Sequence, residues 1–344
     1  MEIPIRNLYH LLLYAWDYLE PGDVVPVSGL RTDQPVDLLA YLLARATERL
    51  MKQGLDQGYV ESVGSTTRIR GSIDFSGSVR SGAVARSRLL CRFDELRHDV
   101  LHNRILRTTL RQISEADGLD GSLRGELLRL YDRMDAVAET RISRSSFKRV
   151  RLDRNNRFYG VLMSICAFVY EGLVVDQEAG TRKFFDFPRD EVKMRLLFQN
   201  FVKNLLRRRL PKSWEVGGRR IEWQRAQGDN RDLRYLPTMN TDVVVEHGSR
   251  SLLIDTKYTT NVLGTYREVE RIHAGHLYQL FAYLQNYAEF KSGQDVRGLL
   301  LYPRSGHPLD VSFSVMGHPI RLATLDLSQR WEDVESDLIR LATV

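Results

Sequence analysis

Hydrophobic residues recur along this chain with two spacings, which predict where helices and strands lie. A spacing of three or four residues, which lines one face of a helix, begins with Leu8, Leu11, Leu12 and Ala15. Between Tyr59 and Phe93 the chain has short segments rich in Val, Thr, Ser and Gly, which predict β-hairpins with a basic character. Further helices are predicted over 37–53, 98–113, 122–134 and 158–174.

The second half of the chain has an ordered succession of predicted elements. A helix is followed by three strands, a helix and a strand, and then by a further strand and a further helix. These segments are 190–210, 213–223, 241–246, 251–258, 274–290, 296–303, 321–327 and 331–342. The order predicts an α/β fold with an α-β-β-β-α-β core, preceded by an α+β region.

The composition is that of a folded protein that does not enter a membrane. The chain has 344 residues, more than a single domain of about 100–200 residues, so two domains are expected. Its residues are 43% hydrophobic and 27% charged, which is usual for globular proteins. Charges interrupt the apolar N-terminal residues and no long apolar run occurs, so a cytoplasmic protein is expected.

Charge and cysteine content exclude few classes of function. The net charge of +6 favours a polyanionic partner such as nucleic acid. Seven cations lie between Arg141 and Arg157 with Asp153 as the only acid, and this strip is either a solvated linker or a surface that contacts phosphate or a partner. Cys91 and Cys166 are the only cysteines, which excludes a disulfide framework and a cysteine-rich zinc site.

The sequence TDVVVEHGSRSLLIDTKY ends an apolar strand in charged residues. If HGSR connects two antiparallel strands, Glu246 pairs with Ser251 and Asp242 lies opposite Asp255. Lys257 follows Asp255 by two residues and projects on the same face of the strand. Two carboxylates and an ammonium group are therefore predicted to converge at one end of the sheet.

Facing carboxylates destabilise a sheet unless their charge is neutralised, and Mg²⁺ prefers oxygen ligands of this kind. We therefore predict a Mg²⁺ ion at Asp242 and Asp255, with Mn²⁺ as a substitute. Such an ion stabilises charge on a phosphodiester under attack and lowers the pKa of the attacking water. Lys257 is then predicted to orient or deprotonate that water or to hold a phosphate oxygen. The alternative is that Asp255 and Lys257 form a simple ion pair at a solvated strand edge.

The helix that follows adds two polar residues on one face. Gln279 and Tyr283 are four positions apart, so their side chains are neighbours. His273 and His276 lie earlier on the same helix. We interpret this histidine pair as a surface pair, because no third metal ligand is apparent in the sequence.

These residues resemble a known nuclease superfamily. Asp242, the group Asp255, Thr256 and Lys257, and the helical segment QLFAY are similar to the PD-(D/E)XK nucleases with the Q-x-x-x-Y element of their RecB-like branch. Over its full length the chain resembles the McrC family, the nuclease subunits of McrBC-type modification-dependent restriction systems. The segments that carry this resemblance are IPIRNLYHLLLYAW, RIRGSIDF, HNRILRTTL, FFDFPRDEVKM, TDVVV, LLIDTKY and HLYQLFAYL.

The resemblance implies a domain arrangement and a set of site residues. A partner-engaging domain with helices and a β-hairpin-rich arm is expected over 1–155, and a PD-(D/E)XK nuclease domain over 156–344. The metal ligands implied are Asp242, Asp255 and the carbonyl of Thr256. The catalytic set implied is Asp242, Asp255, Lys257, Gln279 and Tyr283, of which the last two support the site or the DNA.

The chain departs from the superfamily pattern at two places. Thr241 stands where the superfamily name has proline. The first core helix often offers a glutamate to the metal, but here the matching position is Gln199, and Glu191 is the alternative acid.

The resemblance also implies partners. McrC-like proteins act with a GTP-hydrolysing AAA+ hexamer of the McrB type on double-stranded DNA that carries modified cytosine, and they stimulate its GTP hydrolysis. This chain has no G-x-x-x-x-G-K-[ST] loop, so GTP is expected to bind the partner and not this chain. The basic hairpins from Thr66 to Arg92 are the expected inserting arm, or else a β-domain that only positions the nuclease.

Three functions remain open from the sequence. The first is a Mg²⁺-dependent DNA endonuclease subunit. The second is a regulatory activator of a ring NTPase that does not cleave DNA, which the missing glutamate favours. The third is a RecB-like exonuclease that acts from DNA ends, which Gln279 and Tyr283 favour.

Overall fold

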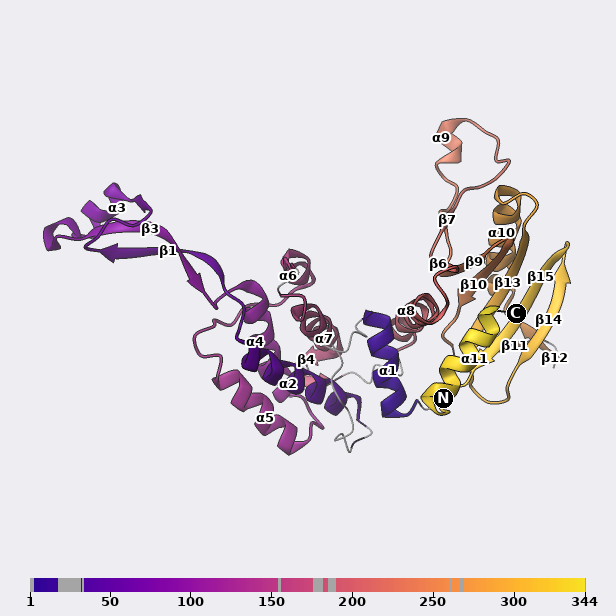
Figure 1. Cartoon of the computed structure of the whole chain (residues 1–344), viewed down its shortest axis with the longest axis horizontal. Coiled ribbons are helices and arrows are strands. Elements are labelled where there is room, and N and C mark those ends of the chain that lie inside the picture. The colour runs from indigo at the N-terminus through magenta and orange to yellow at the C-terminus, as the bar shows by residue number, and fades with distance from the viewer. Residues whose placement is uncertain are drawn as a thin grey trace. The chain divides into compact units, whose positions relative to one another are not determined.

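The chain folds into two compact units that do not coincide with its two halves (Figure 1). The computed structural model describes residues 3–17, 32, 34–153, 156–175, 182–184, 190–259, 261–266 and 269–343. One unit, here called the sheet unit, combines Met1–Val24 with Asp186–Val344, and the other, the arm unit, is Val25–Phe185. The predicted boundary lay after residue 155, whereas the arm unit extends to Phe185 because α7 (Tyr159–Gly172) packs on α2 (Pro35–Gln53) and α4 (Leu101–Ser114). The first helix belongs to the sheet unit because it packs on α8 (Glu191–Arg209).

The sheet unit is built on a six-stranded mixed sheet. Its helices are α1 (Ile5–Trp16), α8 (Glu191–Arg209), α9 (Asn230–Leu233), α10 (Ala274–Phe290) and α11 (Trp331–Thr343). Its strands are β6 (Glu215–Gly217), β7 (Arg220–Ile221), β8 (Met239–Asn240), β9 (Val243–His247), β10 (Arg250–Thr256), β11 (Leu263–Tyr266), β12 (Val269–Ile272), β13 (Asp295–Pro303), β14 (Asp310–Val315) and β15 (His318–Leu325).

The sheet has the strand order β14-β15-β13-β10-β9-β6. β13 runs parallel to β10 and to β15, and the other neighbours are antiparallel. The predicted mixed α/β fold is therefore confirmed at the level of its mixed sheet. β14 was not predicted from the sequence, and it pairs with β15 to form one edge of the sheet.

Helices cover both faces of this sheet because its central strands are apolar on both sides. On one face, Leu280 and Leu284 of α10 pack with Leu253 and Leu300 in one buried cluster. A Cβ atom at Gly298 would lie 2.8 Å from the Leu284 side chain, so this glycine permits the close approach of α10 to β13. α8 packs against β6, β9 and β10, and α1 and α11 pack against α8.

α1 is fixed to α8 by polar contacts as well as by its apolar face. Asn204 Nδ2 of α8 donates a hydrogen bond of 2.9 Å to the carbonyl oxygen of Tyr14. The Tyr14 hydroxyl donates to Glu335 of α11 at 2.6 Å. Tyr14 of α1 therefore contacts both α8 and α11, two helices far from it in the sequence.

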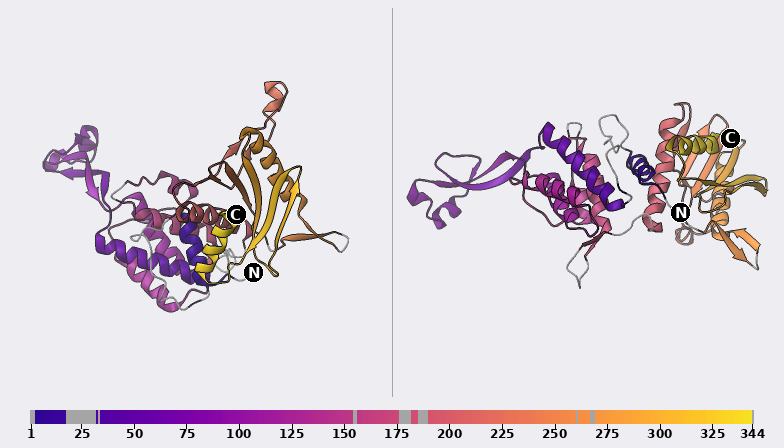
Figure 2. Two further views of the ribbon diagram at one scale, coloured as in Figure 1. Left: turned by 45° about the vertical axis from the view of Figure 1, so that its right-hand side comes forward. Right: turned by 90° about the horizontal axis from the view of Figure 1, so that it is seen from below.

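The arm unit consists of a helical group and a projecting β-hairpin. Its helices are α2 (Pro35–Gln53), α3 (Phe75–Arg80), the 3₁₀ turn η1 (Val84–Arg86), α4 (Leu101–Ser114), α5 (Gly121–Asp132), α6 (Arg144–Arg149) and α7 (Tyr159–Gly172). Its strands are β1 (Gly58–Thr66), β2 (Ser72–Ile73), β3 (Leu89–Arg97), β4 (Leu173–Val175) and β5 (Arg182–Phe184). Within this unit, β1 and β3 lead away from the helical group formed by α2, α4, α5 and α7 in all three views (Figures 1 and 2).

The predicted hairpins are confirmed, and the structure adds short helices to them. β3 pairs antiparallel with β1 and with β2. α3 begins where the Asp74 side chain accepts a hydrogen bond from the Gly77 amide. The strip 141–157 contains α6, which begins at a capping box formed by Ser143 and Ser146, while residues 154 and 155 lie outside the described residues. Residues 185–189 of the segment FFDFPRDEVKM also lie outside them.

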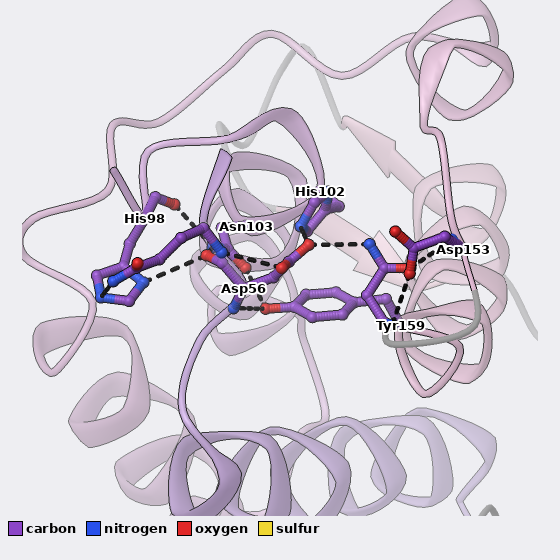
Figure 3. A network of polar contacts seen from close by, with 8 residues as sticks. Asp56, His98, His102, Asn103, Asp153 and Tyr159 are labelled. Carbon is purple, nitrogen blue, oxygen red and sulfur yellow. Dashed lines mark hydrogen bonds and ion pairs between the residues drawn. The ribbon is translucent and has the colours of Figure 1, made fainter. Parts of the chain in front are cut away.

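A buried polar network joins the root of the hairpin to α4 and α7 (Figure 3). The Asp56 amide donates to the Tyr159 hydroxyl at 3.0 Å, and this hydroxyl donates to Asn103 Oδ1 at 2.5 Å. Asn103 Nδ2 in turn donates to the carbonyl oxygens of Asp56 and His98. The His102 ring lies 2.9 Å from the Asp56 carboxylate. Both ends of the hairpin, near 56 and 98, are therefore tied to Asn103 of α4, and the end near 56 is tied also to Tyr159 of α7.

We expect Tyr159→Phe to destabilise the arm unit by about 1–3 kcal/mol, because it leaves the buried Asn103 oxygen and the Asp56 amide without their partner. Urea unfolding of the full chain measures this loss. Tyr131→Phe removes a hydroxyl that contacts Glu139 at an exposed position, and it serves as the control with an expected change within about 0.5 kcal/mol. Equal changes in the two variants would contradict a structural role for the network.

No helix in the described part of the chain is both long enough and apolar enough to cross a membrane.

Candidate active site

The predicted register of the two central strands is confirmed. β9 and β10 pair antiparallel with Ser251 opposite Glu246 and Ile254 opposite Val243. Continued by one residue, this register places Asp242 opposite Asp255. The convergence predicted from the turn sequence therefore occurs, at the end of the sheet where β10 ends and β9 begins.

Asp242 is held in place by the residue that follows Asp255. Its Oδ2 atom accepts hydrogen bonds from the Thr256 amide at 2.8 Å and from the Thr256 hydroxyl at 2.7 Å. Two donors on one oxygen fix the rotamer of this carboxylate. Neither donor contacts its other oxygen. Thr256 itself is buried, so the contact is part of the folded sheet.

Asp255 is a buried carboxylate beside a cation. It is only 2% exposed, and Lys257 Nζ lies 2.8 Å from its Oδ2 atom. This ammonium is the one polar partner of that oxygen among the described residues. Burial raises the pKa of Asp255 to about 6; the Lys257 ammonium opposes this rise and the Asp242 carboxylate adds to it.

A polar chain runs from Asp255 to α10. Lys257 Nζ donates a hydrogen bond of 2.8 Å to Gln279 Oε1, and Gln279 Nε2 donates to the Tyr283 hydroxyl at 2.8 Å. The Lys257 side chain is 14% exposed, so its ammonium is held between two partners and shielded from bulk water. The structure therefore brings together all the side chains that the sequence placed at this site.

A second layer behind these residues was not predicted. His276 Nδ1 lies within hydrogen-bond distance, 2.8 Å, of the Tyr302 hydroxyl. Burial lowers the pKa of His276 to about 4, and the Lys257 ammonium contributes to this lowering, so this histidine is neutral at physiological pH. Burial raises the pKa of Tyr302, and the negative charge of Asp255 adds to this rise. His276 is thus a half-buried residue of the site and not the surface residue that its spacing suggested.

The donor set fits a hard divalent cation. Asp242 and Asp255 offer carboxylate oxygens and Thr256 adds its backbone carbonyl, which are the ligand types of Mg²⁺. Lys257 Nζ already contacts Asp255 Oδ2, so a cation bound at that oxygen would share it with the ammonium. The described residues contain no group of three or more histidines, cysteines or acids that could hold a metal, so such a cation would keep several waters.

No third acid reaches the site from the first core helix in the described structure. Glu191 is exposed at the beginning of α8. Burial raises the pKa of Tyr258 and the Glu191 charge adds to this rise, whereas the charges that act on the pKa of Asp255 are those of Lys257 and Asp242. Tyr258 packs against Phe198 of α8, away from the α10 face where Lys257 meets Gln279. Gln199 of α8 is half-buried.

The raised pKa of Asp255 predicts how stability depends on pH when no metal is present. The folded chain binds this proton more tightly than the unfolded chain, in which the pKa is near 3.8. Folding stability is therefore expected to fall as the pH rises from about 4 to about 6, by at most about 3 kcal/mol, since a tenfold change in proton affinity corresponds to about 1.4 kcal/mol. Asp255→Asn should remove this part of the pH dependence in urea unfolding with EDTA. If the free energy of unfolding depended on pH in the same way for the two proteins, this prediction would be contradicted.

Comparison with known proteins gives consistent matches over the chain. The family described as "McrBC 5-methylcytosine restriction system component" matches residues 7–303. The "Type IV methyl-directed restriction enzyme EcoKMcrBC" of Escherichia coli (strain K12) is 28% identical over 337 residues, which are 98% of this chain and 96% of that protein.

Among solved structures, a half-complex from a tetradecameric assembly of Thermococcus gammatolerans McrB AAA+ hexamers with bound McrC matches the fold with a TM-score of 0.60. The match has 18% sequence identity and covers 98% of this chain and 75% of that one. At this identity the likeness concerns the fold.

Proposed function

The chain belongs to the McrBC 5-methylcytosine restriction system component family, and we propose that it is the nuclease subunit of a methylation-dependent restriction complex. In this proposal it is an endonuclease that hydrolyses phosphodiester bonds of double-stranded DNA with Mg²⁺ or Mn²⁺. The similarity to the Escherichia coli type IV methyl-directed restriction enzyme supports the restriction role.

The observation that carries the nuclease role is the meeting of Asp242, Asp255 and Lys257 at one end of the sheet. The order α8, β6, β9, β10, α10, β13 supports a PD-(D/E)XK core for this unit. Here a carboxylate with a raised pKa is buried beside a lysine, at a sheet end that also offers a carbonyl oxygen. Burial of such a group lowers the stability of the fold. This cost is understandable if the group binds a cation, which removes the repulsion between the carboxylates.

The residues divide the chemistry among them. When bound by Asp242, Asp255 and Thr256, Mg²⁺ supplies charge neutralisation for the phosphodiester and lowers the pKa of a bound water. Asp242 keeps its position through the two Thr256 hydrogen bonds. Lys257 is charged beside Asp255, so it orients the attacking water or holds a phosphate oxygen through its ammonium hydrogens. Gln279 accepts one of these hydrogens and so limits where the ammonium can point.

We further propose that the chain acts with an AAA+ GTPase hexamer of the McrB type and stimulates its GTP hydrolysis. The Thermococcus structure that this fold resembles contains McrB AAA+ hexamers with bound McrC. The segment proposed to contact the ring is the hairpin arm between Thr66 and Arg92, which has six arginines and Asp74 as its only acid.

The arm also exposes apolar side chains. Those in and beside it that are exposed include Tyr59, Val63, Ile69, Ile73, Phe75, Val79, Val84 and Leu96. Exposed apolar residues grouped on one element are typical of a protein interface. The same arm would serve the alternative function, a regulatory activator that does not cleave DNA.

The test is cleavage of closed circular DNA, methylated and unmethylated, with Mg²⁺, in the presence and absence of the cognate ring NTPase and GTP. Cleavage that needs the partner, GTP and methylation supports the proposal. Stimulation of GTP hydrolysis without cleavage under any condition favours the regulatory activator. Degradation restricted to linear DNA favours an exonuclease, because a closed circle has no end.

A further inference from the structure

A short ribbon extends from the sheet at the end where the acidic residues lie. It consists of residues 218–240, with β7 and β8 as its two strands and α9 near its tip, and it stands away from the sheet (Figure 1). β6 pairs with β9, and β7 pairs with β8 further along the same two chain segments. Because β9 begins just after Asp242, the ribbon continues past the carboxylates, beyond the end of β10.

The root of the ribbon is firmly attached. Trp223 Nε1 donates a hydrogen bond of 2.7 Å to the Pro237 carbonyl, which joins its two sides. The Gln224 amide donates to Asn286 Oδ1 at 2.7 Å, and the Arg225 guanidinium pairs with Glu289 at 2.6 Å. Asn286 and Glu289 are on α10, the helix that also carries Gln279 and Tyr283. The ribbon is therefore held by the helix that supports the proposed active site.

The tip offers cations and an aromatic ring to solvent. Arg231 and Arg234 are exposed, and no ion pair connects either to an acid in the described part of the chain. The Arg234 guanidinium lies 4.9 Å from the centre of the Tyr235 ring and donates to its hydroxyl at 3.0 Å. Tyr235 is 76% exposed, and α9 buries none of its residues. Packing of the fold explains none of these three side chains.

We infer that this ribbon is a DNA-contacting element beside the active site, an inference that rests on the proposed nuclease function. Arg231 and Arg234 bind backbone phosphates of the duplex near the scissile bond, and Tyr235 packs against a sugar or base edge. Arginine is suited to this role because its guanidinium donates in pairs to phosphate oxygens. Contacts to phosphate fix the register of the duplex without reading its sequence. The ribbon would thus position any DNA that the partner delivers.

The experiment measures how binding of DNA depends on salt. The full chain carrying Asp255→Asn, which is expected to bind without cutting, is titrated against a short fluorescein-labelled duplex over a range of NaCl concentrations. Adding Arg231→Ala and Arg234→Ala should weaken binding and make the slope of log K against log salt shallower by about 2, since each lost phosphate contact removes about 0.9. Adding Tyr235→Ser should weaken binding and leave the slope unchanged.

A charge-matched control separates local contacts from a general loss of positive charge. Lys212→Ala with Arg330→Ala removes the same charge from exposed positions, and Lys212 precedes β6 at the end away from the ribbon. This pair should leave the slope nearly unchanged. An equal effect of the two double variants, or no effect of either, would overturn the inference.

Further outcomes distinguish this inference from the function on which it rests. The ribbon variant is the chain with Arg231→Ala and Arg234→Ala. If the complex with unchanged Asp255 cuts DNA, and the ribbon variant cuts and binds DNA equally well, the ribbon inference fails and the nuclease proposal stands. If no complex cuts DNA but the ribbon variant loses its phosphate contacts, the nuclease proposal fails and the ribbon is still a DNA contact. If the ribbon variant loses stimulation of the partner's GTP hydrolysis while keeping its salt slope, the ribbon contacts the ring and not DNA.

Discussion

Asp255→Asn is expected to lower DNA cleavage by the partner-activated complex by about a thousandfold or more. The substitution keeps the size of the side chain and removes one of the two carboxylates that face each other where β9 begins and β10 ends. Neutralisation of transition-state charge by a bound metal contributes several kcal/mol, and each 1.36 kcal/mol corresponds to about tenfold in rate. Single-turnover cleavage of closed circular methylated DNA measures the change.

The same variant should keep its fold and its partner. Above pH 6 the neutral amide of the variant replaces a carboxylate that is buried at a cost, so unfolding in EDTA should need at least as much urea as for the original chain. Stimulation of the partner's GTP hydrolysis should be unchanged. Asp295→Asn is a control at a paired, exposed aspartate on β13 and should cut normally. Cleavage by Asp255→Asn within tenfold of the original rate would show that the metal is held elsewhere.

Removal of the hairpin tip is expected to abolish stimulation of the partner's GTP hydrolysis. A chain in which residues 67–88 are replaced by a two-residue turn keeps the pairing of Thr66 with Leu89 that ends the long hairpin. It loses most of the exposed apolar residues and arginines proposed to contact the ring. The stimulated rate should fall to that of the ring alone. Steady-state GTP hydrolysis at fixed ring concentration measures it.

A control for this deletion tests whether the arm's chemistry or its length matters. Phe75→Ser with Val79→Ser keeps the hairpin and replaces two side chains that are 66% and 58% exposed on α3. This pair should reduce stimulation with little effect on folding, because neither side chain is buried. Full stimulation by the shortened chain would assign the ring contact to another surface and leave the arm as a structural domain.

The site was predictable from the sequence mainly because its residues lie on one hairpin. The connection HGSR is short, so the register of β9 and β10 followed from it, and with it the positions of Asp242 and Asp255. Gln279 was predictable as a neighbour of Tyr283, but its contact with Lys257 depends on how α10 is rotated on the sheet. That rotation depends on packing such as the approach of Leu284 to Gly298, which leaves no pattern in the sequence.

Other features gave a misleading signal or none. Tyr302 lies in the apolar run VRGLLLYP and is fully buried, so it was not distinguishable from core residues, and His276 was therefore missing its partner. The predicted strand over 213–223 is two short strands, β6 and β7, and the rest of the ribbon, 224–240, was assigned no element, because β7 and β8 are only two residues long each. The amphipathic pattern of α1 predicted a helix but not the unit to which that helix belongs, because an apolar face does not identify its partner.

The assignment of α1 to the sheet unit has a consequence for the order of events during synthesis. Since α1 leaves the ribosome before the arm unit and its packing surface on α8 lies nearly 200 residues later, its apolar face stays uncovered while the whole arm unit is translated. The arm unit is continuous in sequence and can complete its contacts before the sheet unit exists. Nascent chains of this protein are therefore expected to complete the arm proposed to bind the ring before the site proposed to cut DNA, and to depend on chaperones most strongly during that interval.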